Sequence, residues 1–528
     1  MPGGLLNLVS YGSQNVILNG NPSKTFFKCS YAKYTNFGLQ KFRVDFDGQK
    51  ALRLNQNSVF EFKFPRYADL LMDTYLVVTL PTIWSPIHYG GADDEFSLCN
   101  PYEFKWIDNL GTQLIKEVSF TVGGQLIQKF SGQYLYNMVQ RDFTSDKKRL
   151  YNAMTGHTIE LNDPETFNEG IYPNAVYNEA DGIAGAEPSI RSRKIFIPIN
   201  IWFTLMHKMA FPLVSLQYNE LHMELTLRPI VELFVIRDVL DTSNYIKANQ
   251  NISEYGFYRF IQQPLLPGEE YIDKRTNWNA DIHLMSTYCF LSDDEVRVFA
   301  AQPQKYMIKE VFEYRFDNQI GSGRVELDSL GLVSNWMWYF QRSDADLRNE
   351  WSNYTNWPYN EKPFFPTIDA SLCYQQIGVT GPFKVENQKD ILLEWGILLN
   401  GDYRENLMDA GVYNYIEKYV RTLSYAKEGL YCYNFCLNSD PFTCQPSGGI
   451  NMSKFKTIEF EYVTYLPPMD ENAQTFIVCD PSTDDDLPVA INKPVWRLYD
   501  YNYNLVVFEE RYNILVFQSG NAALMYVR

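Results

Sequence analysis

The sequence contains no run of about 18 consecutive apolar residues, the length that a membrane-spanning helix requires. Its start, Met1-Pro-Gly-Gly-Leu-Leu-Asn7, has neither the basic region nor the long apolar region of a signal peptide. Histidine is scarce, with five residues in 528, at positions 88, 157, 207, 222 and 283. These show no His-x-His or His-Glu-x-x-His spacing, so neither a metal centre nor a catalytic triad is indicated. We expect a soluble chain made in the cytosol.

Paired cysteines are also missing. The eight cysteines stand at 29, 99, 289, 373, 432, 436, 444 and 479, mostly inside apolar stretches, which is typical of reduced, buried thiols. Cys432 and Cys436 fall on one face of a predicted strand and, with Cys444, are candidate metal ligands. Because no histidine is near and the spacing is not Cys-x2-Cys, the pattern favours buried thiols. We predict no disulfide framework, no metal site and no cofactor.

Basic residues are outnumbered, with 46 Lys and Arg against 63 Asp and Glu, for a formal charge of −17. A nucleic-acid surface needs clustered basic side chains, so we predict no direct contact with nucleic acid. Long helical patterns are scarce too. Aromatic residues make up 16% of the chain, and short alternating runs are broken by Gly, Pro and Asn. This composition predicts an all-β fold with short helices and long inserted loops.

The stretch 195–228 shows the unit from which the chain is built. Residues 195–203 and 221–227 each alternate apolar and polar side chains, which predicts two strands with one buried face. The same pattern returns at 431–437 and 458–462. Phe196 to Leu221 is 25 residues and Tyr431 to Ile458 is 27, so strand, crossing and strand recur with similar dimensions. We predict that the two strand pairs occupy equivalent places in two similar units.

The segments upstream of these pairs also agree. Strands at 118–122 and 391–399 run into turns at Gly123-Gly124 and Asn400-Gly401, and each turn is followed by a predicted helix. Ser131 caps the first helix and Asp409 the second. The apolar positions of the two helices are Leu135, Met138 and Val139 in the first copy and Val412, Ile416, Tyr419 and Val420 in the second. The first copy is longer by roughly 42 residues, and we interpret 151–192 as an inserted loop.

The repeat divides the chain into four predicted segments: an arm at 1–24, a β-sandwich at 25–235, a linker at 236–259 and a second β-sandwich at 260–528. The glycines and Pro22 of the arm exclude one regular element, and its apolar clusters require a partner. Strands are predicted at 26–36, 59–64 and 75–80 in the first sandwich. The second is predicted to begin with a strand at 282–290 and to continue with strands at 306–316 and 332–340.

An insert at 341–366 carries Trp351, Tyr354, Trp357 and Tyr359 among polar residues. Such a segment binds glycan, clamps a neighbouring subunit or packs on its own domain, and the sequence leaves these alternatives open.

Enzymatic chemistry has little support. A carbohydrate-binding or glycan-cleaving β-sandwich is the alternative to a structural protein, and Glu459 and Glu461 are its candidate carboxylates. Adjacent acids on one strand face more often form a solvated surface. Asp484-Asp-Asp486 suggests weak calcium binding, although an acidic turn is usually only hydrated. We predict no catalytic residues.

Several ordered motifs resemble one known family. They begin with Gly3-Gly4-Leu5, Leu8-Val9, Tyr11-Gly12, Gln14, Asn19-Gly-Asn-Pro22 and Thr25-Phe-Phe-Lys28, and continue with Val122-Gly-Gly-Gln125, 213–219, Gln445-Pro-Ser-Gly448, Tyr512-Asn513 and Ser519-Gly520. Together they resemble the major capsid proteins of nucleocytoplasmic large DNA viruses. Residues around Arg228-Pro229-Ile230 look most like the giant-virus branch. Asn7 and Asn15 depart from the pattern, because relatives tend to have Gln and Asp there.

The resemblance implies a double jelly roll, two eight-stranded antiparallel sandwiches in tandem. It implies a homotrimer that forms a pseudo-hexagonal capsomer and tiles an icosahedral shell with neighbouring capsomers. It also implies minor capsid proteins as partners, location in the virion, and contact of the arm with an internal viral membrane. The repeated β unit fits this arrangement, because three chains with two similar units each supply six similar corners.

Overall fold

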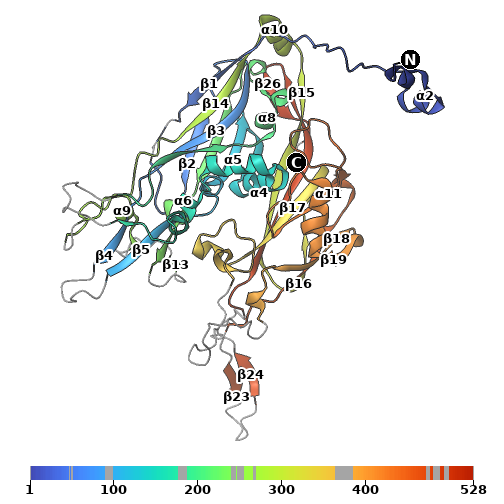
Figure 1. Ribbon diagram of the computed structural model, residues 1–528. Helices are drawn as coiled ribbons and strands as arrows, with labels where there is room; N and C mark the ends of the chain where they lie inside the picture. The colour runs from blue at the N-terminus through green and yellow to red at the C-terminus, as the bar shows by residue number, and fades with distance from the viewer. Residues whose placement is uncertain are drawn as a thin grey trace.

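The structure is a computed structural model, and it describes residues 2–46, 48, 51–89, 99–175, 187–239, 245–246, 255–265, 269–362, 384–470, 476–479, 488–492 and 499–526. These residues form two β-sandwiches side by side, with an N-terminal arm that projects away from them (Figure 1). No helix in this part of the chain is long and apolar enough to cross a membrane.

The first unit contains two antiparallel sheets that face each other. One has the order β1-β14-β3, with β9 and β10 both paired to the far side of β3, and the other has the order β2-β11-β6-β7. The strands of the first sheet are β1 (Gly38–Val44), β14 (His283–Phe290), β3 (Leu70–Leu80), β9 (Arg193–Pro198) and β10 (Phe211–Pro212). Those of the second are β2 (Ser58–Lys63), β11 (Leu221–Leu227), β6 (Ile115–Val122) and β7 (Gln125–Ser131).

The second unit repeats this order. One sheet runs β15-β25-β17-β20 and the other β16-β22-β18-β19. Its strands are β15 (Gln304–Gln319), β25 (Tyr503–Gln518), β17 (Leu332–Arg342), β20 (Leu430–Asn434), β16 (Ser322–Glu326), β22 (Ile458–Thr464), β18 (Leu392–Leu399) and β19 (Asp402–Asp409), with short β21 (Ile450–Asn451) and β26 (Asn521–Leu524) at the margins. In the first unit β1 pairs with β14, its last strand, and in the second unit β15 pairs with β25, its last long strand, so both sandwiches have the jelly-roll order.

The predicted equivalence of the two strand pairs is confirmed. β9 and β20 both pair with the third strand of their first sheet, and β11 and β22 both lie second in the other sheet. The second strand of each pair buries alternate side chains, as a sheet with one wet face requires. The first is shorter than predicted, because β9 ends at Pro198 and 202–205 form a short helix, α8 (Trp202–Leu205).

The strand β14 belongs to the first unit, although the sequence placed it in the second. β14 pairs antiparallel with β1 and with β3, so it is the last strand of the first unit. The prediction that 282–290 opens the second unit, and with it a boundary at 260, is therefore wrong. The residues of a strand predict that it forms, but they carry no information about which sheet receives it. The short helix α10 (Asp293–Ala301) joins β14 to β15, where the second unit begins.

Two further predictions are corrected. No strand forms at 26–36. These residues are exposed, with Phe26 and Phe27 at 90% and 98%, and the first strand starts only at Gly38. The stretch 151–192 is not simply a loop. Its described part holds the end of α5 (Ser145–Thr155), then α6 (Ile159–Asn162), α7 (Pro164–Phe167) and the short strand β8 (Asn174–Ala175).

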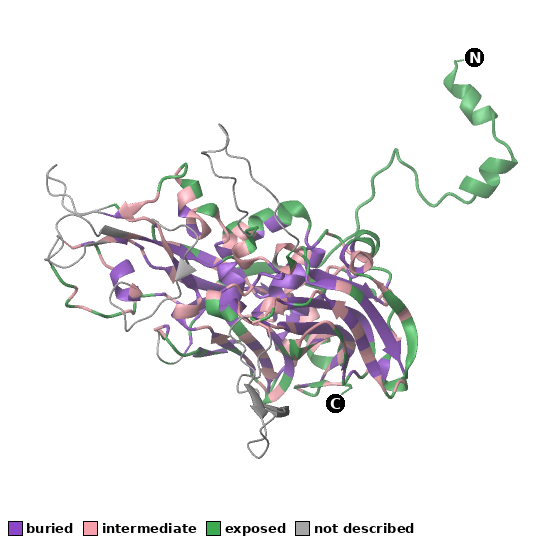
Figure 2. Ribbon diagram, turned by 90° about the horizontal axis from the view of Figure 1, so that it is seen from below, coloured by how far each residue is buried: buried purple, intermediate pink, exposed green. Residues whose placement is uncertain are grey.

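The arm contains two short helices, α1 (Gly4–Val9) and α2 (Ser13–Asn19), followed by residues without regular structure up to β1. All its described residues are exposed, and Figure 2 shows it as a green segment apart from the buried sandwiches. The arm leaves the body at the end where α10 lies. The long connections, with β4 (Ser85–Tyr89), β5 (Cys99–Trp106), β12 (Phe234–Asp238), β13 (Tyr245–Ile246), α9 (Phe257–Phe260), β23 (Phe476–Cys479) and β24 (Pro488–Asn492), lie at the opposite end (Figure 1).

The buried apolar side chains form two main cores. The core of the second unit contains Trp336, Trp338, Trp395 and Phe460, whose rings pack against one another at centroid distances of 4.4 to 6.2 Å. The core of the first unit does not stop at its own boundary. It continues through Met337, Tyr339 and Phe508 on the outward face of the second unit's sheet. The two sandwiches therefore share apolar packing as well as a chain.

Candidate functional site

The helix α4 (Gly132–Asp142) is the centre of the contact between the two units, and it lies between them in Figure 1. The turn at Gly123 and Gly124 adopts positive φ values, which favour glycine, and returns the chain as β7. Ser131 then caps the helix as predicted, because its hydroxyl accepts from the Tyr134 N–H at 3.3 Å. Gly132 is required by close approach: a Cβ there would lie 2.1 Å from the Ile115 carbonyl oxygen.

A buried charge cluster at the end of α4 joins the units. The Arg141 guanidinium donates to Asp142 at 2.7 and 2.9 Å, to the Asn335 side-chain oxygen on β17 at 2.8 Å, and to Glu510 on β25 at 2.7 Å. Asp142 also accepts from the Ser439 hydroxyl at 2.6 Å. All five side chains are buried. Two belong to the first unit and three to the second, so the cluster fixes one relative position of the sandwiches.

The pKa values of Glu510 and Asp142 depend on the one guanidinium that they share. Burial by itself would raise the pKa of the Glu510 carboxyl, but Arg141, Lys309 and Asn335 together lower it to about 2. Burial raises the pKa of the Asp142 carboxyl, which shares Arg141 with Glu510. The Lys309 ammonium lies 3.7 Å from Glu510 and adds a second cation. Removal of either partner would leave a buried charge without compensation.

The aromatic insert forms a second contact. Its described part, 341–362, packs on the first unit of the same chain as well as on its own unit, and contact with the first unit was not among the alternatives that the sequence offered. The Trp351 indole donates to the Glu232 carbonyl at 3.0 Å, and its ring lies 3.8 Å from the Arg228 guanidinium. The Tyr354 hydroxyl donates to Asn137 of α4 at 2.8 Å. The insert is thus a clamp between the units.

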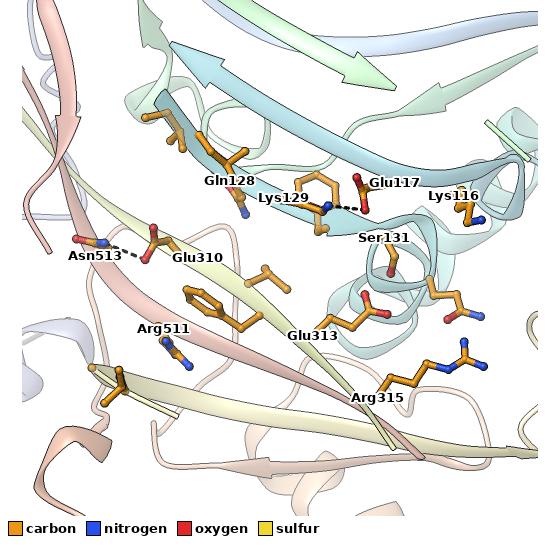
Figure 3. A pocket seen from close by; sticks show the side chains of 18 of the residues that line it. Lys116, Glu117, Gln128, Lys129, Ser131, Glu310, Glu313, Arg315, Arg511 and Asn513 are labelled. Carbon is orange, nitrogen blue, oxygen red and sulfur yellow. Dashed lines mark hydrogen bonds and ion pairs between the residues drawn. The ribbon is translucent and has the colours of Figure 1, made fainter. Parts of the chain in front are cut away.

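A groove with a volume of about 1460 Å³ lies between the units beside these contacts. Figure 3 shows β6 and β7 side chains on one wall and β15 and β25 side chains on the other. The Lys129 ammonium pairs with Glu117 at 2.8 Å, and the Asn513 amide donates to Glu310 at 2.8 Å. Burial between the two units raises the pKa values of Glu310 and Glu313.

The groove offers little for catalysis. A raised pKa suits a proton donor, but the Glu310 carboxylate accepts from the Asn513 amide, and Glu313 is hydrogen-bonded to Ser131. None of the histidines whose side chains are described lines the groove. Within the described ranges, no three His, Cys, Asp or Glu side chains are arranged to hold a metal ion.

The predicted carboxylate pair belongs to a sheet surface. Glu459 and Glu461 lie on the polar face of β22. Glu461 accepts from the Tyr403 hydroxyl and from Arg324 at 3.2 Å, and these bonds lower its pKa. The general acid of a glycan-cleaving enzyme needs a raised pKa, so the lowered pKa of Glu461 does not suit that role.

The remaining candidates do not form a constellation. Cys432 is buried in β20, and burial raises the pKa of its thiol to about 11, which disfavours a metal-binding thiolate. Cys436 is buried and Cys444 is exposed. His157, His207, His222 and His283 lie on separate segments. Asp484-Asp-Asp486 lies outside the described residues.

Sequence reasoning missed the Arg141 cluster. Its only local signal is an Arg-Asp pair that ends a helix with apolar residues at Leu135, Met138 and Val139. The partners on β17 and β25 are roughly 200 and 370 positions away, so no local pattern connects them.

Comparison with known families decides what this scaffold belongs to. Residues 25–262 match the model for the major capsid protein N-terminus, and residues 295–523 match the model for the large eukaryotic DNA virus major capsid protein. The chain belongs to the major capsid proteins of large eukaryotic DNA viruses. The junction between the two matched regions contains β14, which belongs structurally to the first unit.

Relatives of this capsid protein support the assignment. The major capsid protein of Chrysochromulina ericina virus is 29% identical over 362 residues, which cover 65% of this chain and 58% of that protein. That of Paramecium bursaria Chlorella virus 1 is 24% identical over 530 residues and covers both chains fully. The chain spans about three fifths of the length of the Chrysochromulina ericina virus and Phaeocystis pouchetii virus relatives.

Solved capsid structures share the fold. A quasi-atomic model of the PBCV-1 virus capsid matches with a TM-score of 0.62 at 17% identity, over 96% of this chain and 100% of that one. The Faustovirus major capsid protein matches with a TM-score of 0.61 at 12% identity, over 98% and 96%. The predicted all-β class and double jelly roll are confirmed.

Proposed function

We propose that this chain is the main building block of an icosahedral viral shell and resides in the virion. The observation that carries this function is the pair of jelly rolls with one strand order, locked together by α4, in a chain of the capsid family. A shell protein needs a rigid body that repeats its contacts, and the buried Arg141 cluster holds the two units in one arrangement.

The chain associates with itself, and the proposed association is a homotrimer. Three chains contribute six similar sandwiches, which gives a pseudo-hexagonal outline from one polypeptide. Such capsomers then pack against neighbouring capsomers. Minor capsid proteins are further proposed partners, and nucleic acid is not, because the net charge is −17.

The two ends of the molecule have different proposed roles. The end with the long connections faces the exterior, and the end with α10 and the arm faces the interior. Arm residues such as Leu8, Ile17 and Leu18 are 76%, 82% and 78% exposed and would gain from burial against a partner. We assign this arm to contacts beneath the shell, with minor proteins or an internal viral membrane.

The domain division is revised to follow the sheets. We propose that the first jelly roll comprises β1 through β14 and the second β15 through β26, with the arm before β1 and α10 between them. The predicted linker at 236–259 is instead part of a long connection within the first unit, since β12 pairs with β5.

We further propose that the chain is not an enzyme. The hydrogen bond from Tyr403, with Arg324, lowers the pKa of the Glu461 carboxyl, whereas a general acid needs a raised pKa, and the relatives are capsid proteins, so the carbohydrate alternative has no support. Pooled glycan and ester substrates should show no turnover above a heat-treated control. Turnover abolished by a single carboxylate substitution would overturn this part of the proposal.

The shell function has a direct test. The purified full-length chain should have three times the monomer mass of 61.6 kDa in solution, and electron microscopy should show hexagonal arrays at high concentration. A monomer that forms no arrays under any assembly condition would contradict the proposed function.

A further inference from the structure

Residues 24–34 of the arm have the pattern of a strand but belong to no sheet. Phe27, Cys29 and Tyr31 alternate with polar residues, which is the period of a strand with one apolar face. The structure gives these residues no regular element, and Tyr31 and Tyr34 are 89% and 84% exposed. A partner that covered these rings would gain about 25 cal/mol for each Å² of apolar area buried. We call residues 24–34 the aromatic segment.

The aromatic segment is basic, although the chain as a whole is acidic. It carries Lys24, Lys28 and Lys33, and no Asp or Glu occurs between Pro22 and Phe37. The formal charge of the whole chain is −17. A surface that fits this segment therefore needs apolar side chains for the rings and carboxylates for the ammonium groups.

The groove between the two units runs along two edge strands. Among the described strands, β7 ends one sheet of the first unit and β15 ends one sheet of the second, and both line the groove. An edge strand presents backbone N–H and C=O groups that can receive one more strand. At one point a side chain bridges the gap, since the Gln128 amide donates to the Lys309 carbonyl oxygen at 3.4 Å.

The walls of this groove expose apolar side chains to solvent. Leu126 on β7 and Met307 on β15 are 48% and 43% exposed, and Leu332 on β17 is 42% exposed. All three line the groove. Its volume of about 1460 Å³ exceeds the roughly 300 to 1,000 Å³ of a small-molecule pocket, so it has room for a peptide segment.

Two glutamates of β15, Glu310 and Glu313, also line the groove (Figure 3). Burial raises the pKa values of both carboxyls. The guanidinium groups that oppose this shift belong to Arg511, Arg315 and Arg228, and each is ion-paired with another carboxylate. A lysine ammonium that entered the groove would therefore stabilise the ionised form of these glutamates.

The aromatic segment starts within reach of the groove. The Thr35 hydroxyl donates to Glu295 at 2.7 Å, which holds the chain on α10 directly after the segment. The helix ends at Ala301, and β15 then leads to Met307 at the groove wall. From Glu295 to Met307 the chain takes six helical and six extended steps, which cover at most about 30 Å. Ten extended residues span about 33 Å, so residues 25–34 can enter the groove while Thr35 stays on α10.

We propose that the aromatic segment adds to the free edge of β15 as an antiparallel strand, inside the groove of its own chain. The tether sets the direction, because the chain enters the groove near Met307 and continues toward its own N-terminus. With Tyr34 beside Met307, the register places Lys28 opposite Glu313, and neighbouring strands gain from such opposite charges. This contact goes beyond the proposed shell function. It divides the arm into a docked strand and two helices, α1 and α2, which stay outside for contacts beneath the shell.

A disulfide tests whether the groove receives this segment. Lys28→Cys combined with Glu313→Cys should form a link within one chain on mild oxidation, in a background with Cys29→Ser and Cys444→Ser that removes the exposed cysteines of the described residues. Ile272→Cys in place of Glu313→Cys is the control and should stay unlinked, since Ile272 is 98% exposed and lies in the connection between α9 and β14.

Mass spectrometry of mixed isotope-labelled and unlabelled chains separates links within one chain from links between chains. Links between chains alone would mean that a neighbour's arm occupies the groove, and they would overturn the inference. Absence of any link between the two positions would overturn it as well.

Hydrogen exchange tests the contact without new cysteines. Edge amides of residues 305–315 should exchange about tenfold faster in a chain with Phe27→Ser and Tyr31→Ser than in the native chain, because the added strand protects β15. Ile17→Ser with Leu18→Ser is the matched control, since both side chains are exposed arm residues outside the segment, and it should leave the rate unchanged. Equal exchange in all three chains would contradict the docking. Oligomeric mass is measured on the same samples, so a failure here is distinguishable from failure of the proposed homotrimer.

Discussion

Replacement of Arg141 by methionine should separate the stability of the contact between the jelly rolls from that of the jelly rolls themselves. Arg141 is 1% exposed and is the shared cation of Asp142 and Glu510, which are also buried. Methionine keeps part of the side-chain volume, but both carboxylates lose the guanidinium that they share. Loss of one partner of a buried ion pair costs about 3 to 5 kcal/mol, and this is the expected loss in the free energy of unfolding.

The assay is urea unfolding followed by tryptophan fluorescence, with Trp336, Trp338 and Trp395 reporting the second core. The Arg141→Met chain should unfold at lower urea, with its units separating before the second core opens. Arg404→Met is the control, because Arg404 is an exposed cation whose pair with Glu405 contributes little. A loss below about 1 kcal/mol for Arg141→Met would refute the idea that this cluster holds the units together.

The same cluster predicts how the free energy of unfolding changes with pH. Because the folded-state pKa of Glu510 is lowered from 4.5 to about 2, its contribution is present above pH 4.5 and is lost as the pH falls through 2. This acid sensitivity should weaken in Glu510→Gln. An unchanged acid transition in that variant would show that other carboxyls control it.

Two single sites and the arm give three further predictions. Burial raises the pKa of Glu103 to about 7, so its effect lowers stability as the pH rises from 4.5 to 7; Glu103→Gln should remove that slope and stabilise the chain at pH 8 by roughly 3 kcal/mol, measured by urea titration at several pH values. Gly132→Ala should destabilise by roughly 1 to 3 kcal/mol, because the new Cβ meets backbone oxygen atoms, whereas Gly4→Ala, with open space around it, should be neutral in a thermal melt. A chain that starts at Ser23 should keep its oligomeric mass and melting temperature but fail to form arrays; a monomeric or unfolded product would place the arm in the core instead.

The strands were readable from sequence wherever one face is buried. β11 and β22 show period-two alternation because their inner side chains enter a core and their outer side chains meet water. The hairpin turn at Gly123-Gly124 and the cap at Ser131 depend only on neighbouring residues, so they were also predicted. The prediction of a strand at 26–36 was wrong, because its aromatic residues lie outside any sheet and are exposed.

The sequence by itself therefore determined the all-β class, the presence of two similar units, the N-terminal arm, and, through its ordered motifs, membership of the capsid family. Only the tertiary structure decided which sheet takes β14, which unit the aromatic insert clamps, and that Arg141 meets Glu510. These outcomes depend on contacts between residues hundreds of positions apart, which no periodicity records. The repeat gives one more example. The helix α4 and the segment formed by η8 (Val412–Ile416) and α11 (Glu417–Arg421) have similar sequences, but only the structure shows that Met138 and Val139 are buried while Tyr415 and Ile416 are exposed.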